Sequence, residues 1–215
     1  MDDASVHILW ARLRDWSEKG WKREEARANL DEALIRSPSS PEAHFWRGLF
    51  EMEEDRLNEA LPHLSAALAV KPNEPRYLLA NAKLYRKLPR SDERSTRLED
   101  LVGRLSKVAT SASALHFVGK HYWNAGHMTE AIPFMRRAIQ KDPGCWSCLN
   151  TYASMLFERG LIQDAYEVQT SAVHTAPDGE DREGLIERMK KYENAVKTRL
   201  LESGLPFLSP ADDAE

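Results

Sequence analysis

Two cysteines separated by two residues, Cys145 and Cys148, have the spacing of a dithiol redox motif or of part of a metal site. They lie at the start of a predicted helix, where the helix dipole and the free backbone amides lower the pKa of a thiol. The redox motif, however, normally stands beside a strand in an α/β unit, and no such unit is predicted here. Zinc needs two more ligands at a matching spacing, and no second paired motif occurs. The sequence therefore favours structural or incidental cysteines over redox sensing, and redox sensing over metal binding; two cysteines so close together make no disulfide framework.

Other residue types that carry chemistry are scattered along the chain. His116, His121 and His127 fall on different faces or ends of one predicted helix, so they complete no metal site. No histidine pairs with a serine and a carboxylate in a pattern that predicts a hydrolase triad. The sequence also lacks a glycine-rich phosphate loop. We therefore expect a protein that is not an enzyme and that holds no metal or cofactor.

Composition narrows the class of protein further. The 215 residues are 42% hydrophobic and 30% charged, which suits one ordinary folded domain. A net charge of −4 argues against general nucleic-acid binding, which needs a strong positive field. No apolar run approaches the roughly 18–20 residues of a membrane-spanning helix, and the first residues do not have the pattern of a secretory signal. We expect a cytoplasmic protein without nucleic-acid or membrane partners.

An internal repeat is the most informative feature of the sequence. Two columns of alanine and one of proline recur with gaps of 34, 71 and 34 residues, the middle gap holding one further unit with about three extra residues. The columns are Ala26, Ala60, Ala131 and Ala165; Ala33, Ala67, Ala138 and Ala172; and Pro38, Pro72, Pro143 and Pro177. The first alanine marks where the second helix of a hairpin crosses the first, and the second alanine returns to the same face two turns later. The proline ends that helix. Each unit is therefore predicted to be a helix, a tight turn, a second helix and a stop.

This pattern resembles the tetratricopeptide repeat family, whose period is 34 residues. The clearest copy carries Leu115, Gly119, Tyr122, Gly126, Ala131, Met135, Ala138 and Pro143. The resemblance implies an all-α fold, a right-handed α-solenoid of antiparallel helix hairpins with about five repeats and a C-terminal capping helix. We expect a single domain over residues 1–204, followed by a flexible acidic tail over 205–215. The expected units are residues 7–40, 41–74, 75–111, 112–145 and 146–179, with a capping helix over 181–201.

Two units depart from the pattern. In the first unit Arg14 stands where the family pattern has a small residue, so the two helices of this unit are expected to pack less closely. The unit 75–111 lacks the alanines in its second half, and we place its extra residues near Ser91, a predicted N-cap, or in a longer second helix. The capping helix has one apolar face, which is expected to cover the last repeat. That face consists of Leu185, Met189, Tyr192, Val196 and Leu200.

The resemblance also implies where a partner would bind, because the first helix of each unit lines the concave side of the solenoid. Carrying over the groove-facing positions of the family predicts a surface that is apolar, then basic, then aromatic and polar. Its residues are Phe45, Leu49, Met52, Arg76, Lys83, Arg86, Lys87, His116, Lys120, Trp123, Asn150 and Phe157. Large apolar side chains at positions that hairpin packing does not require are typical of binding surfaces. Trp123 and Phe157 have an alternative role, which is packing against an adjacent helix.

The expected function is that of a non-catalytic adaptor or scaffold that holds a segment of another protein in this groove. The basic positions favour a partner with acidic side chains next to apolar ones. Two alternatives stay open at this stage. One is a client-specific chaperone or secretion partner, and the other is an accessory subunit of an enzyme complex. The sequence indicates no oligomeric state.

Overall fold

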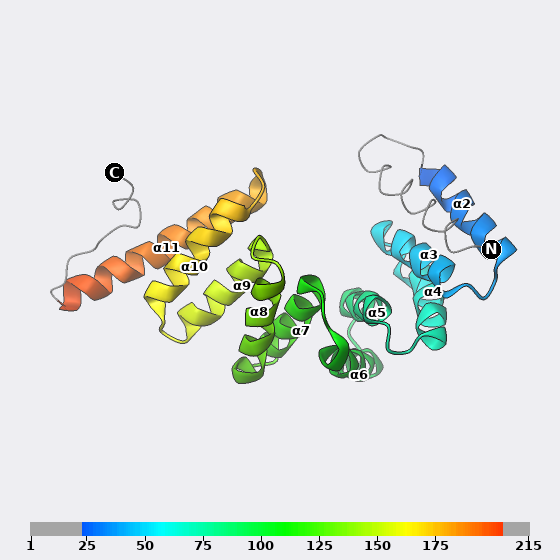
Figure 1. Ribbon diagram of the computed structural model, residues 1–215, viewed down its shortest axis with the longest axis horizontal. Helices are drawn as coiled ribbons and strands as arrows, with labels where there is room; N and C mark the ends of the chain where they lie inside the picture. The colour runs from blue at the N-terminus through cyan, green and yellow to red at the C-terminus, as the bar shows by residue number, and fades with distance from the viewer. Residues whose placement is uncertain (1–22, 204–215) are drawn as a thin grey trace. The chain divides into compact units, whose positions relative to one another are not determined.

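The computed structural model describes residues 23–203, and every regular element in that range is an α-helix (Figure 1). This confirms the predicted all-α class. The chain divides into two compact units, which end and begin at Ala109 and Thr110, and each unit is described by itself. The helices are α2 (Arg23–Arg36), α3 (Pro41–Glu53), α4 (Leu57–Val70), α5 (Pro75–Lys87), α6 (Asp92–Val108), α7 (Ala112–Asn124), α8 (Met128–Lys141), α9 (Trp146–Glu158), α10 (Ile162–Thr175) and α11 (Glu180–Ser203).

Four helix hairpins, α3–α4, α5–α6, α7–α8 and α9–α10, coincide with the predicted units that begin at residues 41, 75, 112 and 146. Helix α2 lies where the second helix of the unit at 7–40 is predicted. The first helix of that unit, with Arg14, and the tail 205–215 lie outside the described residues. The single domain over 1–204 stays a prediction.

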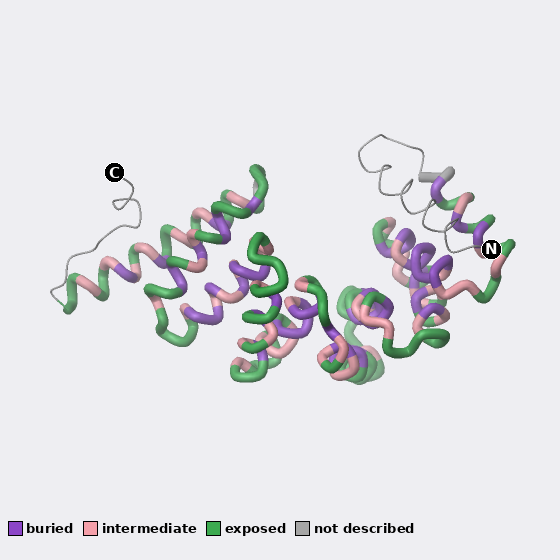
Figure 2. Tube along the Cα trace, viewed as in Figure 1, coloured by how far each residue is buried: buried purple, intermediate pink, exposed green. Residues whose placement is uncertain are grey.

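Small residues allow the two helices of a hairpin to approach closely. Ala60, Ala131 and Ala165 have no exposed surface, as the first alanine column requires. A Cβ atom placed on Gly48 of α3 would lie 2.5 Å from Cγ of Leu64 in α4, well inside contact distance. Glycine is therefore required at this crossing. Figure 2 shows the buried residues in purple along the helices of both units.

Helix ends follow the local sequence. Pro72, Pro143 and Pro177 each come two residues after the last residue of α4, α8 and α10, respectively. At the other end, the Ser91 hydroxyl accepts a hydrogen bond from the amide of Arg94 at 3.1 Å, so the predicted N-cap of α6 is confirmed.

Helix α6 accounts for the extra residues of the degenerate unit, because it has 17 residues where α4, α8 and α10 have 14. Its fourth residue is Ser95, which is exposed, whereas the fourth residue of the other three helices is a buried alanine. Leu98, Leu101, Val102 and Leu105 form the buried stripe instead.

The capping helix predicted at 181–201 is α11, and it buries Leu185, Tyr192 and Val196 against the preceding hairpin. Tyr192 and Val196 share an apolar cluster with Tyr166 of α10 and Leu156 of α9. This helix therefore closes the second unit and also supplies one side of the site described next.

Candidate functional site

In the first unit, two predicted groove residues belong to the core. Phe45 and Met52 of α3 are 5% and 8% exposed. The Phe45 ring lies 4.9 Å from the ring of Tyr77 on α5, between centroids, and 4.8 Å from that of Trp46. Leu49 is partly buried against the same cluster. The expectation that hairpin packing does not require Phe45 and Met52 is therefore wrong, because they fill the space between consecutive first helices.

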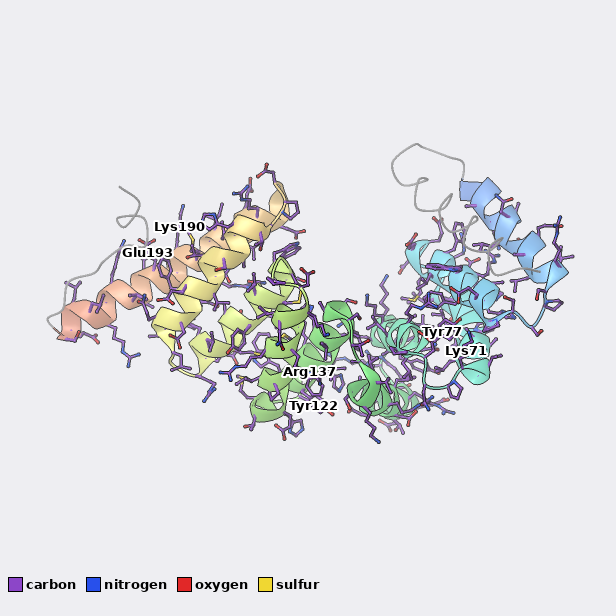
Figure 3. All side chains as sticks on the ribbon, in the orientation of Figure 1. Lys71, Tyr77, Tyr122, Arg137, Lys190 and Glu193 are labelled. Atoms are coloured by element: carbon purple, nitrogen blue, oxygen red, sulfur yellow. A yellow bond between two sulfur atoms is a disulfide. The ribbon has the colours of Figure 1, made fainter. Side chains whose placement is uncertain are left out.

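Arg76, another predicted groove residue, holds α5 to α3. Its guanidinium lies 3.3 Å from the carboxylate of Glu42, and it also covers the Phe45 ring at 5.6 Å from the centroid. Tyr77 donates a 2.7 Å hydrogen bond to the same carboxylate, and burial together with that acceptor raises the pKa of Tyr77. Figure 3 labels Tyr77 within this unit. Arg76 is half-exposed, but its charge is already paired.

Lys83, Arg86 and Lys87 are exposed along the same helix, α5. Desolvation and the nearby Arg86 lower the pKa of Lys83. The amine of Lys87 is 3.9 Å from the carboxylate of Asp55, a distance at which an exposed pair contributes little. These three basic side chains stay candidates for an acidic partner.

The second unit contains a cavity of about 570 Å³ between α7, α9 and α11, called here the α7–α9–α11 site. Four of the predicted groove residues meet in it: Lys120, Trp123, Asn150 and Phe157. His116 does not line the cavity, but its Nε2 atom is 2.9 Å from the hydroxyl of Thr151, which does. The complete lining is Lys120, Trp123, Asn150, Thr151, Ser154, Phe157, Glu158, Arg188, Lys191 and Tyr192.

One wall of the site is aromatic. The rings of Phe157 and Tyr192 stack with centroids 4.4 Å apart and planes 15° from parallel. The ammonium of Lys191 lies over the Phe157 ring, 5.3 Å from its centroid. Phe157 therefore has both roles considered from the sequence. It packs against Tyr192 on the adjacent helix α11, and it lines the cavity.

Hydrogen bonds connect the successive helices across the site. Trp123 of α7 donates through Nε1 to the carboxylate of Glu158 on α9 at 2.7 Å. Arg188 of α11 donates to the amide oxygen of Asn150 on α9, also at 2.7 Å. The aromatic ring of Trp123 and the amide of Asn150 are thereby held in fixed orientations, which reduces the ordering entropy that binding would cost.

The charges that line the site are predominantly positive. Lys120, Arg188 and Lys191 contribute three cations, and Glu158 contributes the one carboxylate, which already accepts from Trp123. Lys190, one residue before Lys191, is exposed on α11 but does not line the cavity (Figure 3). The arrangement suits a ligand that carries negative charge next to an apolar group.

Sequence reasoning missed the contribution of α11 to the cavity, because it treated this helix only as a cap and used Tyr192 only as part of the apolar face that covers the last repeat; Arg188 and Lys191 also line the cavity. A signal was available, because α11 begins at residue 180, which is 34 residues after α9 begins at 146. The capping helix thus takes the place of the first helix of a sixth repeat and presents side chains as that helix would.

The two cysteines are bonded to each other, with 5.3 Å between their Cα atoms, so they do form a disulfide although they make no framework. Within residues 23–203, no group of three or more histidine, cysteine or acidic side chains is arranged to hold a metal ion. None of the helices in that range is both long and apolar enough to cross a membrane.

Residues 22–75 match the family model of the tetratricopeptide repeat. Similar solved structures include the thermophilic tetratricopeptide repeat protein TTC0263 of Thermus thermophilus, with a TM-score of 0.64, 17% identity, and coverage of 88% of this chain and 97% of that one. Pseudomonas aeruginosa pilF gives a TM-score of 0.70 at 14% identity, covering 92% and 89% of the two chains. YrrB, described as a tetratricopeptide repeat protein with an unusual peptide-binding site, gives 0.58 at 12% identity, covering 77% and 84%.

Curated protein sequences give no match to the chain. Identities of this size show the shared fold, and the family in question consists in general of protein–protein interaction adaptors that are not catalytic. The sequence match over residues 22–75, together with helix hairpins that recur through the described range, supports a tetratricopeptide repeat protein, and the solved structures show that fold.

Proposed function

We propose that the second unit binds a segment of a partner protein in the α7–α9–α11 site. The observation that carries this proposal is that three consecutive first-helix positions deliver their side chains to one cavity. Concave sites with a few fixed polar groups and an aromatic wall are typical of ligand binding. YrrB, which shares this fold, is described as having a peptide-binding site, and this supports a peptide segment as the ligand class.

The partner segment carries acidic side chains next to an aromatic or aliphatic one. Lys120 and Lys191 attract the carboxylates, and the apolar side chain packs against Trp123 or against the Phe157–Tyr192 stack. Because exposed charges are screened by salt, binding weakens as ionic strength rises. The exposed basic side chains of α5 in the first unit offer a second contact of the same charge preference.

The test uses labelled twelve-residue peptides that place Phe-Leu between pairs of aspartate or glutamate, followed by fluorescence anisotropy. Two matched control peptides replace the acids by their amides or Phe-Leu by Ser-Ser. We expect only the acidic, apolar peptides to bind, and Lys191→Glu to weaken them by about tenfold or more.

Lys190→Glu is the control variant, since it makes the same charge change one residue away and outside the cavity. This variant should leave the affinity within about twofold of that of the unmodified chain, because salt screens the effect of an exposed charge outside the cavity. Equal losses in the two variants, or equal binding of the amide peptides, would contradict the proposed site.

A further inference from the structure

The Cys145–Cys148 disulfide joins the two positions that a side-chain cap connects in other helices of this chain. In α3 and α7 the N-cap serine, Ser40 or Ser111, accepts a hydrogen bond from the amide three residues later, at 3.3 Å in both helices. Helix α9 has Cys145 at its N-cap and no side-chain cap hydrogen bond. Its disulfide joins the N-cap to the third residue of the helix, which is the same pair of positions that the serine caps connect.

The start of α9 in turn supports α11. Trp146, between the two cysteines, packs on a cluster that contains Val173 and Ala176 near the end of α10 and Leu185 of α11. One turn further along α9, Asn150 accepts the hydrogen bond from Arg188. The first two turns of α9 therefore hold the half of α11 that lines the α7–α9–α11 site.

The two sulfur atoms differ in their access to solvent. Cys148 has no exposed surface, whereas Cys145 is partly exposed. An external thiolate therefore reaches Cys145 and not Cys148. The sulfur that leaves, that of Cys148, lies in the first turn of α9, where free amides and the helix dipole stabilise a thiolate.

We propose that Cys145–Cys148 is a reversible thiol–disulfide site, and that its reduction uncaps α9, loosens α11 and weakens binding at the α7–α9–α11 site. A dithiol is the reductant: one thiolate attacks Sγ of Cys145, the sulfur–sulfur bond breaks, and Cys148 leaves as a thiolate that takes up a proton. The second thiol of the reductant then displaces Cys145, so the dithiol becomes a disulfide and both cysteines become thiols. In a cytoplasmic protein, a disulfide is typically transient and redox-sensing. The last step, on binding, rests on the function proposed above.

Hydrogen exchange of the full chain tests the structural step without any ligand. We expect reduction with dithiothreitol to speed amide exchange in residues 149–153 and 186–192 about fivefold, the size of one lost cap, and to leave α3 and α4 unchanged. Mass spectrometry after maleimide labelling confirms the redox state. Rates within about twofold of each other in the two states would overturn the proposal.

A pair of double variants separates capping from other effects of the thiols. Cys145→Ala with Cys148→Ala should exchange like the reduced chain, and Cys145→Ser with Cys148→Ala should exchange like the oxidised chain, because a serine restores the cap. Neither should respond to dithiothreitol. Equal exchange in the two double variants would overturn the capping account.

Binding of the acidic, apolar peptides then tests regulation. We expect about fivefold weaker affinity in the reduced chain, at the lower end of ordinary coupling between sites. If exchange changes and affinity does not, the regulatory step is wrong. If no peptide binds in either state, the proposed function fails, while the exchange result still decides whether the disulfide caps α9.

Discussion

Replacing Gly48 by alanine should destabilise the first unit, although alanine is the better helix former by about 1 kcal/mol. The new Cβ would lie 2.5 Å from Cγ and 2.7 Å from Cδ2 of Leu64, where ordinary contacts are 3.4–4 Å, and 3.1 Å from the backbone nitrogen of Leu64. Leu64 has no exposed surface, so its branch point cannot rotate aside without disturbing the core. Overpacking costs about 1–3 kcal/mol, and the size of this overlap places the cost at the upper end. After the helix gain is subtracted, we expect a net loss of about 2 kcal/mol.

Urea unfolding followed by far-ultraviolet circular dichroism measures this loss. The control is Gly103→Ala in α6, since a Cβ at Gly103 meets nothing within 4 Å. That variant should gain about 0.5–1 kcal/mol from helix propensity alone. The two substitutions are chemically identical, so opposite signs isolate the close contact. If Gly48→Ala is as stable as the unmodified chain or more so, the argument that glycine is required at this helix crossing is refuted.

Three further outcomes can be measured on the first unit. Arg47→Met should cost about 1–3 kcal/mol in the free energy of unfolding, because Glu51, which is 1% exposed, would lose the Arg47 guanidinium 2.5 Å away and keep only the more exposed Arg56 and Arg27 as partners; a chemical denaturation curve close to that of the unmodified chain would contradict this. Burial and the neighbouring His44, whose Nδ1 is 3.0 Å away, lower the pKa of His63, so the folded state disfavours its protonation. Stability should therefore be fully present above about pH 6.5 and fall as the pH drops through the lowered pKa, and His63→Gln should flatten that pH dependence in urea titrations. Ser91→Ala should cost about 1 kcal/mol through loss of the α6 cap, and an unchanged thermal midpoint would argue against that capping bond.

The sequence predicted the helices well because their determinants are local. Buried alanines such as Ala131, helix-ending prolines such as Pro143 and the Ser91 cap act within a few residues, so their spacing fixes where helices begin and end. Lys120 and Trp123, which the family pattern predicted to face the groove, both line one cavity. Local helical periodicity supports this placement.

What the sequence could not supply is the register between helices of neighbouring repeats. Phe45 is buried because the ring of Tyr77, on the first helix of the following repeat, packs against it. The residue type of Phe45 alone does not predict that contact. Likewise, Asn150 meets Arg188 across a separation of 38 residues, one helical turn more than the repeat length, so a strict 34-residue frame pairs the wrong residues. The disulfide was missed for a different reason, since sequence spacing alone does not distinguish bonded cysteines from free ones.

Because the terminal helix α11 forms one wall of the cavity, repeats cannot be added at every position of this array. Repeat proteins commonly lengthen by duplicating a unit, and most insertions leave the other repeats intact because each contacts only its neighbours. A hairpin inserted after α10 would separate Asn150 and Ser154 from Arg188 and Tyr192, to which they are bonded, and would dismantle the cavity. An insertion before α7 would not disturb these pairs. An insertion between α10 and α11 is therefore not tolerated, whereas an engineered extension before α7 should keep the cavity.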